Sequence, residues 1–284
     1  MTADTARPLT LAYSPCPNDT FIFTPWVEGH IESAPPVVER LEDIETLNRA
    51  ALAGEPDVAK VSFHAYGHLR ERYCLLRSGG ALGRGCGPLV VARTPFPKEA
   101  LPEMTVAIPG KLTTAALLLR LFAPTLRAEN VDVRPFHEIL AAVRDGDVDA
   151  GVIIHESRFT YPRYGLTKVV DLAEWWERET AHAIPLGGIA MRRDLGDELI
   201  RRTERALAAS VDYAHAHPDV VWPTVRRHAQ EMEDDVMRQH IALYVNDFTR
   251  DYGTEGQAAI RHLLRTAEDL GLVPRSDQPL FVSR

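Results

Sequence analysis

Short apolar segments with the length of buried strands alternate with helical patterns along this chain of 284 residues. Residues 58–63 read as a buried strand, which follows a helix that Asp43 can begin and Gly54 can end. Strand character returns over 105–108 and again over 147–154, with helical patterns between the two. This alternation predicts an α/β chain with a largely parallel sheet, because parallel strands need crossover connections between them.

Two places in the chain are suited to pass from one structural unit to another. Residues 94–97 contain two prolines and no regular pattern, and apolar strand character resumes over 187–191 after a helical region. We therefore predict one domain made of residues 1–94 and 190–284, which includes the C-terminal helices. Residues 95–189 form the second, inserted domain of this prediction.

Composition limits the partners that the chain can have. Its 32 basic and 40 acidic residues give a net charge of −8, and no block of five basic residues occurs, so we expect no nucleic-acid partner. The longest apolar stretches are like 115–119, far short of a membrane span, and the N-terminal sequence lacks the apolar core of a secretion signal. Cys16, Cys74 and Cys86 have no metal-ligand spacing, which favours reduced thiols, no metal site and a cytoplasmic location.

Polar residues stand at the ends of four predicted strands. They are Ser14, Ser62, the run 110–114 and His155. Any one of them alone is explained by an ordinary turn. Because ligands of open α/β sheets bind at the carboxyl ends of the strands, the four together predict a cleft.

The sequence IPGKLTT over 108–114 superficially suggests a phosphate loop, but Thr105 stands where the first glycine of that motif belongs. A strand, a tight loop and a helix start with hydroxyl groups still make a good anion site, because free amides and the helix dipole point there. On the residues alone, N-capping by Thr113 explains the pattern equally well. The glycine-rich residues 83–87 precede a strand and not a helix, so they do not predict a dinucleotide site.

His155 is the histidine best placed for catalysis. It follows the apolar residues 151–154, and an imidazole with an ordinary pKa of about 6.5 can take a proton near neutral pH. A single histidine at a strand end is, however, more often structural, and Glu156 is a doubtful partner because successive strand residues point to opposite faces. His64 can reach the cleft. Five others are expected on solvated helical surfaces: His215, His217, His228, His240 and His262.

The most specific motif is SPCPNDTFIF over 14–23. It follows an apolar strand and leads into an apolar helical segment, which Asn18 or Asp19 is suited to cap. The run resembles the N-terminal signature of the 1,4-dihydroxy-6-naphthoate synthase family, the lyases of the futalosine route to menaquinone. Four further segments resemble that family in the same order along the chain: KVS at 60–62, GKLTTA at 110–115, AGVIIHE at 150–156 and IPLGG at 184–188.

The resemblance implies a bilobed, periplasmic-binding-protein-like (type II) fold in which two α/β domains are joined by two hinge strands. It also implies a lyase without cofactor or metal that converts cyclic dehypoxanthinyl futalosine, an aromatic carboxylate, to 1,4-dihydroxy-6-naphthoate. His155 matches the position of the family's base. The substrate-binding positions implied are Lys60, Ser62, Thr113, Thr114, Ser14 and Asn18.

Two other functions remain open on the sequence. A chorismate dehydratase of the same pathway is the nearer enzymatic alternative, and the full N-terminal run together with the strand end at His155 favours the synthase. A non-catalytic, cytoplasmic solute-binding protein would share the fold, because a fold does not determine a function. Lys111, beside the predicted anion site, is more simply explained as a solvated surface lysine.

Overall fold

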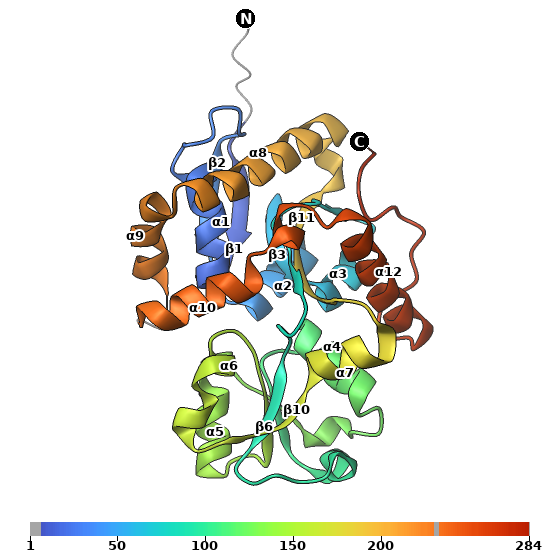
Figure 1. Cartoon of the computed structure of the whole chain (residues 1–284). Coiled ribbons are helices and arrows are strands. Elements are labelled where there is room, and N and C mark those ends of the chain that lie inside the picture. The colour runs from blue at the N-terminus through green and yellow to red at the C-terminus, as the bar shows by residue number, and fades with distance from the viewer. Residues whose placement is uncertain (1–6, 230–232, 284) are drawn as a thin grey trace, which may run out of the picture.

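The computed structural model describes residues 7–229 and 233–283 and shows two lobes, each built around its own β-sheet (Figure 1). The N-terminal and C-terminal parts of the chain together form the first lobe. The middle part forms the second lobe, so the chain passes twice between them.

The first sheet has six strands within the described residues, in the order β2, β1, β3, β11 and β4, with β5 paired to another part of β11. Strands β2 and β3 run parallel to β1, whereas β11 runs antiparallel to β3, β4 and β5. The strands are β1 (Leu9–Tyr13), β2 (Val37–Leu41), β3 (Val58–Ser62), β4 (Tyr73–Leu75), β5 (Ala81–Gly83) and β11 (Ile184–Arg192).

The second sheet has the order β10, β6, β9, β7 and β8. Its strands are β6 (Leu89–Ala92), β7 (Val106–Ile108), β8 (Val131–Val133), β9 (Ala150–Ile153) and β10 (Thr167–Asp171). Strand β7 is parallel to β8 and β9, but β6 is antiparallel to β9 and β10. The prediction of a largely parallel sheet is therefore wrong: both sheets are mixed, because β6 and β11, the strands that follow the two crossings, run against their neighbours.

The crossings between the lobes lie earlier in the sequence than the predicted boundaries. Among the described strands, β6 pairs with β9 and β10 of the second sheet and with no strand of the first, so the second lobe begins before residue 95. β11 belongs to the first sheet from Ile184 onwards, so the first lobe resumes before residue 190. Both strands are apolar and buried, and their sequences do not show which of the two sheets they join.

Helices cover both sheets. Those of the first lobe are α1 (Pro17–Val27), α2 (Ile44–Ala53), α3 (Phe63–Leu69), α8 (Asp197–Ala216), α9 (Pro218–His228), α10 (Asp234–Tyr244), α11 (Asp247–Arg250) and α12 (Gly253–Asp269). Those of the second lobe are α4 (Thr114–Phe122), α5 (Ile139–Asp145), α6 (Ser157–Thr160) and α7 (Leu172–Thr180). In Figure 1, α10 lies on the side of the first lobe that faces the second.

Helix α1 begins at Pro17, with Cys16 as its N-cap residue. Proline suits the first helical position because its φ is preset and its missing N–H would have no helical partner there. Asn18 and Asp19 therefore lie in the first turn, and the prediction that one of them caps the helix is wrong. Because α8, α9 and α10 pack on α1, every residue from 17 to 26 is buried, and the polar side chains of its first turn face the interior.

Helix α2 begins and ends as the sequence predicts. The side chain of Asp43 accepts hydrogen bonds from the amides of Glu45 and Thr46, at 3.0 and 3.1 Å. Gly54 ends the helix with φ 79°, a conformation that glycine adopts without steric cost. This helix positions Glu45 and Asn48 beside the site described below.

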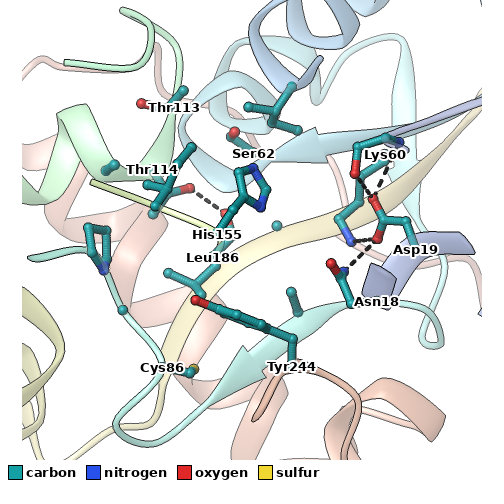
Figure 2. A pocket seen from close by; sticks show the side chains of 18 of the residues that line it. Asn18, Asp19, Lys60, Ser62, Cys86, Thr113, Thr114, His155, Leu186 and Tyr244 are labelled. Atoms are coloured by element: carbon teal, nitrogen blue, oxygen red, sulfur yellow. Dashed lines mark hydrogen bonds and ion pairs between the residues drawn. The ribbon is translucent and has the colours of Figure 1, made fainter. Parts of the chain in front are cut away.

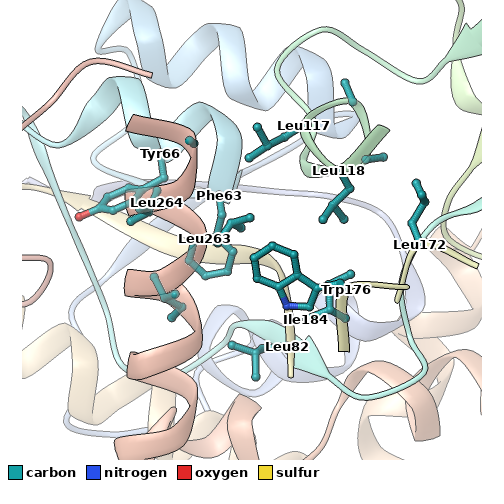
Figure 3. Packing of buried hydrophobic residues seen from close by; sticks show 14 of the residues in the cluster. Phe63, Tyr66, Leu82, Leu117, Leu118, Leu172, Trp176, Ile184, Leu263 and Leu264 are labelled. Carbon is teal, nitrogen blue, oxygen red and sulfur yellow. The ribbon is translucent and has the colours of Figure 1, made fainter. Parts of the chain in front are cut away.

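One apolar cluster joins the two lobes on the side of α3, α4, α7 and α12 (Figure 3). Phe63 and Leu263 belong to the first lobe, whereas Leu117 and Trp176 belong to the second. None of these four side chains is more than 1% exposed. The lobes are thus packed against each other along this side, and α4 contributes both to the cluster and to the neighbouring pocket.

Candidate active site

A pocket between the lobes contains all seven residues that were predicted for the site (Figure 2). It holds about 650 Å³ of open space when its mouth and the solvent there are included. Both lobes supply its wall. The predicted residues that line it are Ser14, Asn18, Lys60, Ser62, Thr113, Thr114 and His155. Their contact with a substrate remains a prediction.

Asp19, which sequence reasoning treated only as a cap, is the centre of a buried polar network at one wall. Its Oδ1 accepts hydrogen bonds from Lys60 Nζ at 2.5 Å and from Asn18 Nδ2 at 2.8 Å. Its Oδ2 accepts one from Ser14 Oγ at 2.6 Å. Asp19 is 1% and Lys60 5% exposed, so the two charges compensate each other away from water. Lys60 therefore reaches the pocket as half of an ion pair and not as a free cation.

Ser62 is fixed from the side by Asn48 of α2. The Asn48 amide donates to Ser62 Oγ at 3.1 Å, and its Oδ1 accepts from the backbone N–H of Ser62 at 2.9 Å. All four polar atoms of this exchange are in buried residues. The hydroxyl hydrogen of Ser62 is thereby left to point elsewhere, which suits donation to a ligand.

The predicted anion site is the start of α4, which begins at Thr114. Thr113 caps the helix: its Oγ1 accepts from the Ala116 amide at 3.2 Å and donates to the Gly110 carbonyl at 2.8 Å. The Thr114 hydroxyl donates to the carbonyl of Leu186 in β11, at 2.5 Å. Thr113 thus both caps the helix and lines the pocket. Lys111, in contrast, is exposed and does not line the pocket.

The loop before α4 is held by side chains of the first lobe. Glu45 accepts from the Leu112 amide at 3.2 Å, and Asn48 donates to the Leu112 carbonyl at 3.4 Å. A ring nitrogen of His64 lies 3.3 Å from the Thr113 carbonyl, and burial lowers the pKa of His64 to about 4. His64 is therefore behind the pocket wall, where it supports the helix start.

His155 follows β9 with φ 55°, a left-handed conformation that is uncommon for residues other than glycine. Its Nδ1 lies 3.5 Å from Cys16 Sγ. The rings of His155 and Phe136 pack edge to face, with centroids 5.1 Å apart and an interplanar angle of 62°. Burial lowers the pKa of His155, and the charge of Glu156 opposes that shift. Burial also raises the pKa of the Cys16 thiol, so at neutral pH a neutral imidazole faces a neutral thiol.

His240 was expected on a solvated surface, and that prediction is wrong. It is 1% exposed and lines the pocket, with Nε2 2.8 Å from Asn18 Oδ1. Its ring lies nearly parallel to that of His155, with centroids 6.1 Å apart. The signal was present in the sequence: Val236, Met237, His240 and Tyr244 recur at helical spacing and form the buried face of α10.

Tyr244 also lines the pocket, and in Figure 2 its hydroxyl end points toward the pocket near Leu186.

Among the residues that the structure describes, no group of three or more histidine, cysteine, aspartate or glutamate side chains is placed to hold a metal ion. Nor does any helix of the described ranges have the length and apolar character needed to cross a membrane.

Comparison with known proteins extends these observations. The sequence matches the family described as menaquinone biosynthesis over residues 9–269. It is 53% identical over 274 residues to a Thermus thermophilus protein named 1,4-dihydroxy-6-naphthoate synthase, which covers 96% of this chain and 99% of that protein. A Streptomyces coelicolor protein of the same name is 49% identical over 277 residues, with 96% of each chain covered.

Solved structures agree with the fold. A protein from Archaeoglobus fulgidus superposes with a TM-score of 0.88 and 34% identity, covering 95% of this chain and all of that one. The alkanesulfonate-binding protein of Xanthomonas axonopodis superposes with a TM-score of 0.68 at 12% identity, covering 95% and 96% of the two chains. The predicted bilobed, periplasmic-binding-protein-like fold is confirmed. From the motifs, the fold and these relatives together, we conclude that the chain belongs to the 1,4-dihydroxy-6-naphthoate synthase family of menaquinone biosynthesis.

Proposed function

We propose that this protein is a carbon–carbon lyase that converts cyclic dehypoxanthinyl futalosine to 1,4-dihydroxy-6-naphthoate, with His155 as the base. The observation that carries the proposal is the composition of the pocket. An imidazole, a helix start and a buried hydroxyl-rich network converge there from both lobes. The names of the relatives in Thermus and Streptomyces support the choice of reaction.

The carboxylate of the substrate binds at the start of α4 in this proposal. Thr113 uses its hydroxyl oxygen on the Ala116 amide, so the amides of Thr114 and Ala115 are the first-turn donors nearest the pocket. The positive end of the helix dipole adds to their attraction for an anion. Lys60 is already compensated by Asp19, so it orients the ligand through its remaining hydrogens and adds little net charge.

The proton is taken by Nε2 of His155. When Nδ1 carries the hydrogen and donates it toward Cys16 Sγ, Nε2 keeps its lone pair for the substrate. The electron pair left behind by that proton forms a new double bond as the carbon–carbon bond to the sugar-derived fragment breaks. The imidazolium returns the proton to the electron pair of the broken bond, so His155 becomes neutral again. The second ring becomes aromatic, which supplies the driving force.

Incubation of the purified protein with cyclic dehypoxanthinyl futalosine and, separately, with chorismate tests this proposal. Chromatography should show 1,4-dihydroxy-6-naphthoate from the first compound and unchanged chorismate in the second tube. Consumption of chorismate would support the dehydratase instead. Binding without consumption of either compound would support a solute-binding protein.

We also expect turnover to survive extensive dialysis and excess chelator without added nucleotide. The reason is that the pocket supplies a base, amides and hydroxyls for a proton transfer. Turnover should stay within about two-fold of the undialysed protein, since general acid–base chemistry at the imidazole needs no further group. Activity that vanishes and returns only with a divalent ion or a nicotinamide would contradict the proton-transfer mechanism.

A further inference from the structure

We propose that His240 is a second substrate-contacting residue, whose Nδ1 accepts a hydrogen bond from a hydroxyl group of the substrate. The identity of that substrate rests on the function proposed above. The arrangement of the site rests on the structure alone: a buried chain of hydrogen bonds leads from Asp19 through Asn18 to the imidazole.

The donors and acceptors along this series of hydrogen bonds can be assigned in only one way. Asp19, paired with Lys60, can only accept hydrogen bonds, so the group that Asn18 turns toward it must be the amide nitrogen, 2.8 Å away. The other side of the Asn18 amide is then its oxygen, which faces His240 Nε2 at 2.8 Å. That oxygen needs a donor, so the hydrogen of the imidazole is on Nε2.

The opposite nitrogen is consequently an acceptor. Burial, together with the nearby His155 and Lys60, holds the pKa of His240 well below its ordinary value, so the ring has only one hydrogen at neutral pH. Within residues 7–229 and 233–283, His240 Nδ1 is buried and has no hydrogen-bond partner. A buried acceptor without a partner is costly, and the pocket that His240 lines is where a donor can arrive.

A hydroxyl group is the donor that fits. His240 is neutral, and the charge of Lys60 at this wall is already compensated by Asp19, so no free charge here would attract an ionic group of the ligand. A ligand hydroxyl can come from the ring hydroxyls, which the product also has, or from the sugar-derived part, which the product lacks. The two sources predict different results for the product.

Two substitutions test the acceptor nitrogen of His240 and its donor nitrogen separately. His240→Gln places an amide nitrogen near the position of Nε2, keeps donation to Asn18 and removes the acceptor. His240→Asn places an amide oxygen near the position of Nδ1 and gives up the bond to Asn18. His217→Gln, at an exposed histidine between α8 and α9 that does not line the pocket, is the matched control.

The measurements are kcat and KM for cyclic dehypoxanthinyl futalosine and the affinity for 1,4-dihydroxy-6-naphthoate. His240→Gln should lower kcat/KM about 10- to 100-fold, the range of one lost hydrogen bond to a buried group, and His240→Asn should recover part of it. If the product also binds more weakly to His240→Gln, the hydroxyl is on the ring. If only the substrate is affected, the hydroxyl belongs to the sugar-derived part. Unchanged kcat/KM in His240→Gln would overturn the proposal.

Nitrogen NMR of the protein labelled in its histidines gives a readout that does not need turnover. In the free protein, His240 should show a protonated Nε2 and an unprotonated Nδ1, and ligand binding should shift only the latter strongly. A hydrogen on Nδ1, or an Nδ1 signal unmoved by both saturating ligands, would overturn the proposal and indicate that water fills the position. A parent protein that shows the expected shift but does not consume the substrate would contradict the proposed function and leave the His240 contact supported.

Discussion

At the scale of single residues, the site depends on histidines that the fold keeps neutral. Burial lowers the pKa of His64, His155 and His240, although each has a different neighbour. A neutral imidazole can accept a proton or a hydrogen bond, which is what the proposed chemistry requires of His155 and His240. His64 instead supports the backbone at Thr113. Two consequences for pH dependence follow from these directions.

The first concerns activity. The base must be neutral to act, and burial lowers the pKa of His155 below its ordinary value of about 6.5. We therefore expect kcat/KM to be level around pH 7 and to fall only when the pH drops below 6.5. A pH profile of kcat/KM measures this directly. A falling limb centred above pH 6.5 would show that another group is the base.

The second concerns stability. His64 has a pKa of about 4 in the folded protein, against about 6.5 when unfolded, so the unfolded chain binds the proton more tightly. The contribution of His64 to the free energy of unfolding is complete above pH 6.5. It is lost as the pH falls from there toward 4, by up to about 1.4 kcal/mol per pH unit. His64→Asn keeps a donor for the Thr113 carbonyl but does not titrate. Urea unfolding from pH 7 to 4.5 should show a shallower fall for this variant, and an equal slope would contradict the assignment.

At the scale of elements, the start of α4 is the part of the second lobe that the first lobe positions most directly. Glu45, Asn48 and His64 all contact the backbone of Leu112 or Thr113. Gly110 makes this approach possible, because a Cβ built there would lie 2.4 Å from the Glu45 carboxylate. The loop and α2 therefore fit only while residue 110 has no side chain.

Gly110→Ala should consequently push the start of α4 away from α2. We expect KM for the substrate to rise about ten-fold or more, because a shift at the helix start moves the amides proposed to hold its carboxylate. Adding Glu45→Ala should recover part of that loss by removing the atoms in the way, although it also removes the bond to Leu112. Gly29→Ala is the control for backbone strain without a clash, since φ is also positive there, at 80°, but nothing lies within 4 Å of the added Cβ. Full activity of Gly110→Ala would contradict the proposed role of this loop.

The same elements show how much the sequence could predict. Local signals were sufficient for the cap of α2 by Asp43, and motif resemblance was sufficient to gather the seven pocket residues. The partner of β6 and the role of Asp19 could not be predicted, because both depend on contacts between segments far apart in sequence. His240 could have been predicted, because the apolar spacing of α10 places it on the buried face; histidines on helices of mixed polarity, however, are more often solvated.

At the scale of the whole molecule, the lobes are joined by more than their two connecting segments. The apolar cluster of α3, α4, α7 and α12 continues across the boundary between the lobes, with Trp176 buried at its centre in Figure 3. The Trp176 ring also lies 5.5 Å from that of His262 in α12. This arrangement predicts that the two lobes unfold together.

Trp176→Ala should lower the free energy of unfolding by about 3 to 5 kcal/mol, as expected for deleting a buried aromatic side chain. Urea unfolding followed by circular dichroism and by fluorescence should give one coincident transition for the parent protein. Val220→Ala, at an exposed valine in α9, should change the free energy of unfolding by less than about 0.5 kcal/mol. Two separate transitions in the parent protein would show that the cluster does not couple the lobes.

The central claim is that His155 moves the proton, whereas the rest of the pocket binds the substrate even when His155 is replaced. His155→Asn tests it most directly, because asparagine tolerates the left-handed conformation of this position but cannot act as a base. We predict that kcat for cyclic dehypoxanthinyl futalosine falls about 100-fold or more while the affinity for 1,4-dihydroxy-6-naphthoate stays within about three-fold of the parent value. A variant that binds the product normally and turns over at a near-parental rate would contradict the account.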